Sequence, residues 1–245
     1  MTECSTNDYT DNFPVSFHVF GIGESFKPII DKIDALGYDG VSAKTITPEQ
    51  LPLPVEEDRM VIILADDGND SVTDAAKSFY QAGVLTLIVS LRQFESQCKF
   101  CDAQLMTDTE TMYQSVKALL DMIFNNGLIA LDFNDIRSSI HDAGFFKVIE
   151  TIGKGGEQRV ADAISKIENI VSPKEMNTIE NFIISISFNR DIQPQVNMCE
   201  MKILSDFISN LPEDVNAIWG VFHDDKIPLD EVRLTAILSG KELMT

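Results

Sequence analysis

Positive charge is scarce in this sequence. Its 19 lysines and arginines stand against 39 aspartates and glutamates, which gives a net charge of −20. Nucleic-acid binding requires cationic side chains that displace counterions from phosphates, so we expect no nucleic-acid partner. An anionic membrane surface would repel the chain for the same reason. Any phosphate site must therefore be built locally, from backbone N–H groups or a bound metal ion.

Long apolar runs and pairs of metal-ligand residues are also rare. No apolar stretch approaches the roughly 20 residues of a membrane-spanning helix. The polar N-terminus lacks the basic start and apolar stretch of a secretory signal. We therefore expect a cytoplasmic protein with reduced thiols, in which residues 1–14 form a disordered tail. Cys98 and Cys101 have the spacing of half a zinc site, but no second cysteine pair completes it, so no metal is predicted.

What the sequence does contain is a regular alternation of strand and helix patterns. Strand, helix, strand, helix and strand are predicted in turn at 15–23, 24–37, 59–65, 71–83 and 84–90. The two later strands are continuous apolar runs, typical of strands buried on both faces. This order predicts a parallel α/β sheet. Residues 92–108 are polar and give no clear prediction.

The second half begins with a well-patterned amphipathic helix at 109–124. Further helices are predicted near 136–149, 157–171 and 196–209, and strands at 181–188, 216–223 and 231–239. We expect two subdomains joined by the long helix. Trp219 lies in a predicted strand with alternating neighbours and is expected in the core, and Met198 and Met201 are expected to pack on the C-terminal sheet.

Three segments resemble the FtsZ branch of the tubulin/FtsZ family. They are GLIALDFNDIRSSIHDAG at 127–144, GEQRVADAISKI at 156–167 and AIWGVFHDDKIPLDEVRLTAILSG at 217–240. The first is similar to that family's acidic loop and following helix, and the last to its final strand pair. The segments occur in the family's order. The resemblance extends from about Phe17 to Gly240, with a gap around 92–108 where this chain is shorter.

The resemblance implies a tubulin/FtsZ-like α/β fold. It implies a degenerate GTPase-type domain with a parallel sheet at 15–108, a central helix at 109–126 and a C-terminal α/β domain at 127–245. Proteins of this family build filaments in which GTP is hydrolysed between stacked subunits. The implied partners are therefore other copies of the chain or subunits of a cell-division FtsZ filament. Because the sequence ends five residues after Gly240, we expect no adaptor-binding tail of the family's kind.

The phosphate-binding glycines that the resemblance implies are largely replaced. Gly21 and Gly23 match the first loop, but its other positions hold Glu24, Ser25, Phe26 and Pro28. The signature loop retains one glycine, Gly68, among Asp66, Asp67, Asp70 and Asp74. Glycines let backbone N–H groups close on phosphate oxygens. Each like-charge contact at 4 Å would cost about 4 kcal/mol. GTP binding is therefore doubtful, Mg²⁺ is expected only together with GTP, and whether the chain is a GTPase stays open.

The remaining candidate residues are acidic. Glu110 occupies the guanine-recognition position at the start of the central helix, although helix first turns are commonly acidic without any ligand. Asp132 and Asp135 match the two acidic positions of the loop that completes a neighbour's GTPase site. Asp132 would act as base or water-positioning group, whereas Asp135 could simply cap the following helix.

Two main functions are open at this point. One is a cap or modulator that no longer hydrolyses GTP efficiently and acts by assembly. The other is a small GTPase whose phosphate site is rebuilt around a metal ion, with Gly21, Gly23, Gly68 and the aspartates. A third reading is a stand-alone binding domain without filament behaviour.

Overall fold

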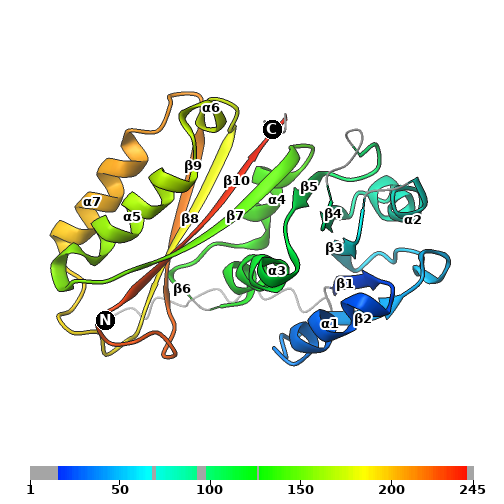
Figure 1. Ribbon diagram of the computed structural model, residues 1–245, viewed down its shortest axis with the longest axis horizontal. Coiled ribbons are helices and arrows are strands. Elements are labelled where there is room, and N and C mark those ends of the chain that lie inside the picture. Colours follow the sequence, from blue (N-terminus) through cyan, green and yellow to red (C-terminus); the bar gives the residue numbers. More distant parts are fainter. Residues whose placement is uncertain (1–15, 68–69, 93–97, 126, 242–245) are drawn as a thin grey trace, which may run out of the picture.

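The computed structural model describes residues 16–67, 70–92, 98–125 and 127–241 (Figure 1). The predicted tail at 1–14 and Gly68 lie outside these residues. The described strands form one sheet in the order β2-β1-β3-β4-β5-β7-β10-β8-β9-β6. They are β1 (Ser16–Ile22), β2 (Val41–Ile46), β3 (Asp58–Ala65), β4 (Leu85–Ser90), β5 (Ala103–Met106), β6 (Gly127–Ile129), β7 (Gly144–Gly153), β8 (Asn181–Phe188), β9 (Asn216–His223) and β10 (Val232–Gly240).

The amino-terminal part of the sheet is parallel, as the alternating pattern predicts. Strands β2, β1, β3, β4 and β5 pair in parallel, and β7 continues this direction through Ala103↔Gly144. Beyond β7, the pairs β7–β10, β10–β8 and β9–β6 are antiparallel, and β8–β9 is parallel. Every residue of β4 is buried, which explains its continuous apolar sequence.

Helices cover both faces of the sheet (Figure 1). They are α1 (Lys27–Asp34), α2 (Asp70–Gln81), α3 (Thr109–Phe124), α4 (Phe133–Ile140), α5 (Arg159–Ile170), α6 (Pro173–Met176) and α7 (Met198–Ser209). One core cluster joins α1, α3 and α4 to the sheet, a second joins α2 to the other face of β1, β3 and β4, and a third lies beneath α5. No helix in the described ranges is long and apolar enough to cross a bilayer.

One local prediction needs correction. The helix expected near 136–149 ends at Ile140, and residues 144–153 form β7, a central strand. The chain reverses at Asp142, whose φ of 54° is incompatible with a continuing helix. The ambiguous segment 92–108 contains β5, which links the two halves of the sheet.

Candidate functional site

The candidate residues lie at two opposite edges of the parallel strands. Gly21 and Gly23 lie at the carboxyl end of β1, and Glu110 follows β5 at that same edge. Crevices at this edge are the usual ligand sites of parallel sheets. The acidic loop lies at the amino edge instead: Phe133 packs its ring against Phe17 at the start of β1, with 5.2 Å between ring centroids. One subunit therefore does not bring the two sets together.

In the loop after β1, two backbone N–H groups already donate hydrogen bonds within the chain. Gly23 donates to the carbonyl of Ile46, and Phe26 donates back to the carbonyl of Gly23. Gly23 has a φ of 101°, which favours glycine. Phe26 is buried beneath the loop while Glu24 stays exposed. N–H groups that already pair within the chain cannot also close on a phosphate.

Gly21 has a packing role in addition to any ligand role. A methyl group at this position would lie 2.7 Å from Phe26 Cβ and 2.9 Å from Ile30 Cγ1. Both neighbours belong to the core that seats α1 on the sheet.

Replacing Gly21 by alanine is therefore expected to lower the free energy of unfolding by about 1–3 kcal/mol, because two buried side chains must shift. Urea unfolding of wild type and variant measures this loss. An unchanged unfolding midpoint would show that the loop adapts freely and that Gly21 has no packing role.

The start of α3 is occupied by its own cap. The carboxylate of Asp108 accepts hydrogen bonds from the N–H groups of Glu110 and Thr111, both at 2.8 Å. The Thr111 N–H and hydroxyl, together with the Glu110 N–H, hold the pKa of Asp108 below its usual range. The side chain of Glu110 is exposed. Sequence reasoning missed Asp108, although an aspartate just before a helical pattern is an ordinary cap signal.

Negative charge dominates this carboxyl edge. Asp66 follows β3 directly and is exposed, as are Glu24, Asp108 and Glu110. Arg92, after β4, is a cation at the same edge, and its side chain is exposed too. An incoming triphosphate would therefore meet more carboxylates than cations among the described residues, and like charges repel most strongly where water is partly excluded.

Asp132 and Asp135 form a reciprocal cap at the start of α4. The Asp135 N–H donates to Asp132 Oδ1, and the Asp132 N–H donates to Asp135 Oδ2, both at 2.9 Å. Asp132 is the N-cap and is exposed, and Asp135 is partly exposed. Each carboxylate uses one oxygen in the cap, so its other oxygen is available to a neighbouring molecule.

A buried carboxylate lies further along the amino edge. Asp102, His141 and Asp142 each place a ligand atom within 4.8 Å of the others, the spacing of a metal site. Asp102 is already satisfied, because it accepts from the Thr86 N–H at 2.7 Å and the Asp142 N–H at 3.2 Å and pairs with His141 Nδ1. These hydrogen bonds join the end of α4 to the starts of β4 and β5.

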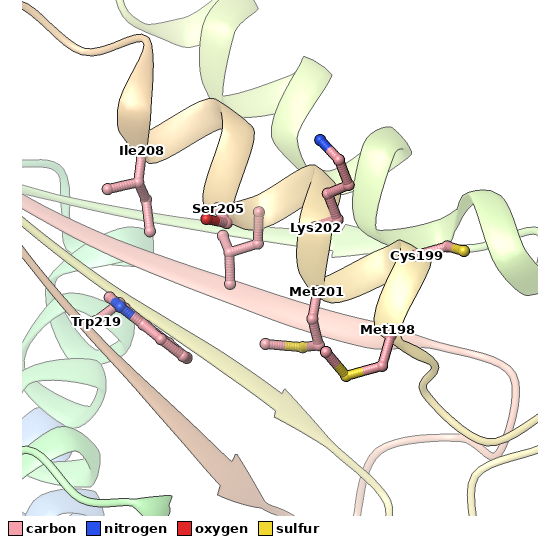
Figure 2. Close-up of a pocket in the computed structure, with 8 residues that line it drawn as sticks. Met198, Cys199, Met201, Lys202, Ser205, Ile208 and Trp219 are labelled. Atoms are coloured by element: carbon pink, nitrogen blue, oxygen red, sulfur yellow. The ribbon is translucent and has the colours of Figure 1, made fainter.

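An apolar groove of about 580 Å³ lies between α7 and β9. Figure 2 shows Trp219 on β9, below the Ile208 side chain and to the left of the Met201 side chain of α7. The prediction that Trp219 is a core residue is wrong, because Trp219 is 38% exposed. The prediction that Met198 packs on the C-terminal sheet is also wrong, because Met198 is 83% exposed. Met201 does pack against the core, as expected. Strand alternation alone did not show that α7 leaves this stretch of β9 uncovered.

Trp219 is the only tryptophan of the chain, so its fluorescence reports on the groove. We expect native emission that is red-shifted relative to a buried indole and is readily quenched by acrylamide. Acrylamide is preferred because a net charge of −20 would repel iodide. Quenching that is negligible before urea unfolding and strong after it would contradict the exposure of Trp219.

Comparisons with known proteins relate this chain to FtsZ proteins, both in sequence and in fold. No family model matches the sequence. The cell division protein FtsZ of Bartonella bacilliformis is 28% identical over 167 residues, which are 65% of this chain but 27% of that protein. The chain thus spans less than a third of this curated relative.

Solved structures resemble the chain over nearly its whole length. A mutant FtsZ from M. jannaschii superposes with a TM-score of 0.71 and 16% identity, covering 92% of this chain and 91% of that one. A TubZ of Bacillus thuringiensis serovar israelensis, solved as protofilaments in its GDP form, gives a TM-score of 0.64 at 8% identity and covers 93% and 86%. The sequence matches and the shared fold together support the assignment of this chain to the FtsZ/tubulin family.

Proposed function

We propose that this chain is a divergent FtsZ-like protein with impaired or absent GTP hydrolysis, which acts by self-association or by docking on a cell-division FtsZ filament. The observation that carries the proposal is the carboxyl edge of the parallel sheet. There the loop N–H groups of Gly23 and Phe26 pair within the chain, and Glu24, Asp66 and Glu110 expose carboxylates. Such an edge disfavours a triphosphate.

The amino edge supports a role in assembly. Its acidic loop is held by the reciprocal cap of Asp132 and Asp135, which fixes the start of α4 without a ligand. A loop fixed in this way can contact another subunit without first paying an ordering cost. Asp132 and Asp135 remain the proposed catalytic groups toward a neighbour's nucleotide, because each keeps one carboxylate oxygen outside the cap.

Isothermal titration with GTP, with and without Mg²⁺, tests the nucleotide part of the proposal. We expect no binding at micromolar GTP in either condition. Micromolar binding that requires Mg²⁺, with phosphate release that disappears in Asp135→Ala, would overturn the proposal in favour of a GTPase with a metal-dependent phosphate site. Asp214→Ala, at an exposed acid elsewhere on the chain, is the matched control and should leave any release unchanged.

Analytical ultracentrifugation tests the assembly part. Association of subunits that each carry a charge of −20 is opposed by repulsion that salt screens. We therefore expect concentration-dependent association that strengthens with added salt and does not require GTP, or co-sedimentation with FtsZ filaments. A strict monomer at high concentration and high salt, with and without FtsZ, would overturn this part.

A further inference from the structure

Three side chains on neighbouring strands form a hydrogen-bonded chain near the amino edge of the parallel sheet. His18 on β1 lies between Ser42 on β2 and Asp58 on β3. His18 Nδ1 lies 2.8 Å from Ser42 Oγ, and His18 Nε2 lies 2.7 Å from Asp58 Oδ1. A hydroxyl, an imidazole and a carboxylate linked in this order are the groups that activate a serine nucleophile.

The Asp58 carboxylate fixes the direction of these hydrogen bonds. An ionised carboxylate only accepts, so the proton of a neutral His18 ring lies on Nε2, and Nδ1 is left as an acceptor. The Ser42 hydroxyl therefore donates to Nδ1. Asp58 is 6% exposed, and its second oxygen accepts from the Val55 N–H at 2.9 Å. The carboxylate is thereby held in place and orients His18 as a base toward Ser42.

An irregularity in the strand pairing brings Asp58 to the same face of the sheet as His18. Phe17 and Val19, the neighbours of His18 along β1, belong to the core cluster that includes α1, so His18 points to the other face. Met60 belongs to that cluster too, and strict alternation along β3 would place Asp58 on its side. The register of β1 with β3 shifts at this point, and such an irregularity re-aims a side chain.

A cavity of about 380 Å³ opens beside these groups. His18, whose side chain is 19% exposed, and the partly exposed Ser42 both line it, so a small molecule can reach them. Lys44 lines it as well and lies two residues after Ser42 on β2, which places both side chains on one face. The connection between β2 and β3 adds apolar side chains, from Pro52, Leu53 and Val55. This lining fits a small ester with an apolar body, whose carbonyl oxygen becomes negative during attack and is stabilised by an ammonium group in the same cavity.

We propose that Ser42 is the nucleophile of an acyl-transfer site for small carboxylic esters, with His18 as its general base and Asp58 as a positioning residue. Ser42 Oγ attacks the ester carbonyl carbon and forms a C–O bond, while His18 Nδ1 takes the hydroxyl proton. The intermediate then breaks its C–O bond to the alcohol, which leaves with the proton from His18. Water attacks the acylated Ser42 in the same way and restores the hydroxyl. One ester and one water thus give one carboxylic acid and one alcohol.

A purely structural tie between three strands would show the same distances, but it would not activate the hydroxyl. Ser165 provides the internal comparison, because it is exposed and its hydroxyl donates to the Asp162 carbonyl instead of a base. If access alone decided reactivity, Ser165 would react first. If the His18 base decides it, Ser42 reacts first although it is the less exposed of the two.

Labelling of the full chain with a fluorophosphonate, followed by peptide mass spectrometry, separates these outcomes. We expect an adduct on Ser42 and none on Ser165. Ser42→Ala should remove the adduct, Ser165→Ala should leave it unchanged, and His18→Gln should slow its formation at least about 100-fold. Should Ser42→Ala fail to fold by circular dichroism, the labelling map of the wild type decides alone. No adduct on Ser42, or labelling of Ser165 at the same rate, would overturn the proposal.

Asp58→Asn tests the positioning role, with Asp58→Glu as the conservative variant. An amide can donate to His18 Nε2, which leaves the proton on Nδ1 and removes the acceptor for Ser42. We expect labelling of Ser42 to slow by about 100-fold or more in Asp58→Asn and to recover in part in Asp58→Glu, which keeps a carboxylate. Wild-type labelling in Asp58→Asn, or no recovery in Asp58→Glu, would overturn the role of Asp58.

Turnover of 4-nitrophenyl acetate without added nucleotide tests the second step separately from the proposed role in assembly. We expect continued release of 4-nitrophenolate beyond one equivalent of protein, at a rate that falls to that of free amino acids in Ser42→Ala and His18→Gln. An acetyl group that remains on Ser42 would overturn the hydrolysis by water. Equal turnover by the wild type and Ser42→Ala would overturn the role of Ser42.

Discussion

Replacing Arg159 by methionine is expected to lower the free energy of unfolding by about 3–5 kcal/mol. The Arg159 and Glu200 side chains are 0% and 1% exposed, and they join α5 to the start of α7. Arg159 Nε lies 2.9 Å and Nη2 3.3 Å from the carboxylate oxygens, and Nη2 also donates to the Pro194 carbonyl. Without the guanidinium, Glu200 would remain buried as an uncompensated charge.

The double variant Arg159→Met/Glu200→Gln separates the value of the ion pair from the cost of breaking it. The amide of glutamine keeps a carbonyl oxygen for the Asn197 N–H, which donates to Glu200 at 3.1 Å in the α7 capping box. We expect the double variant to be more stable than Arg159→Met alone, since no buried charge is left unpaired. Urea unfolding of both variants measures this difference. If the single variant lost less than about 1 kcal/mol, the pair would be accessible to water.

Much of the fold could be predicted from local patterns. The central helix was predicted at 109–124, and α3 spans those residues, because its apolar positions repeat cleanly over four turns. The helix predicted near 136–149 failed since apolar residues at 136, 140, 143, 146 and 149 keep helical spacing across a real chain reversal. Strand β5 was not predicted, because it is only four residues long and includes the buried Gln104. Its sequence therefore lacks a clear hydrophobic pattern.

The candidate site could be predicted only in part. The resemblance located Asp132 and Asp135, but their mutual hydrogen bonds became visible only once the geometry of α4 was known. The capping of α3 by Asp108 follows from one local rule, whereas the contact between Asp102 and His141 joins residues 39 positions apart. Pairings of that kind depend on which strands lie side by side, and single-sequence periodicity does not contain that information.

Replacing Gly153 by alanine is the second change with a large expected effect, a loss of at least about 3 kcal/mol in the free energy of unfolding. A methyl group there would lie 1.7 Å from the Arg159 carbonyl oxygen and 2.9 Å from Ala163 Cβ. The obstruction is backbone, which cannot rotate away as a side chain would. Helix α5 would have to move off β7, which breaks the 3.0 Å hydrogen bond from Thr151 Oγ1 to the Ala163 carbonyl.

Gly155 provides the matched control. It lies two residues further along and has a φ of 103°, but open space surrounds the position where its Cβ would lie. Gly155→Ala therefore tests backbone conformation without a clash, and we expect a loss of about 1–2 kcal/mol. Urea unfolding of the two variants side by side distinguishes the two costs. Equal losses of unfolding free energy in the two variants would mean that α5 can move away from β7 at little cost. The close approach of β7 and α5 would then contribute little to the packing of the carboxyl-terminal half.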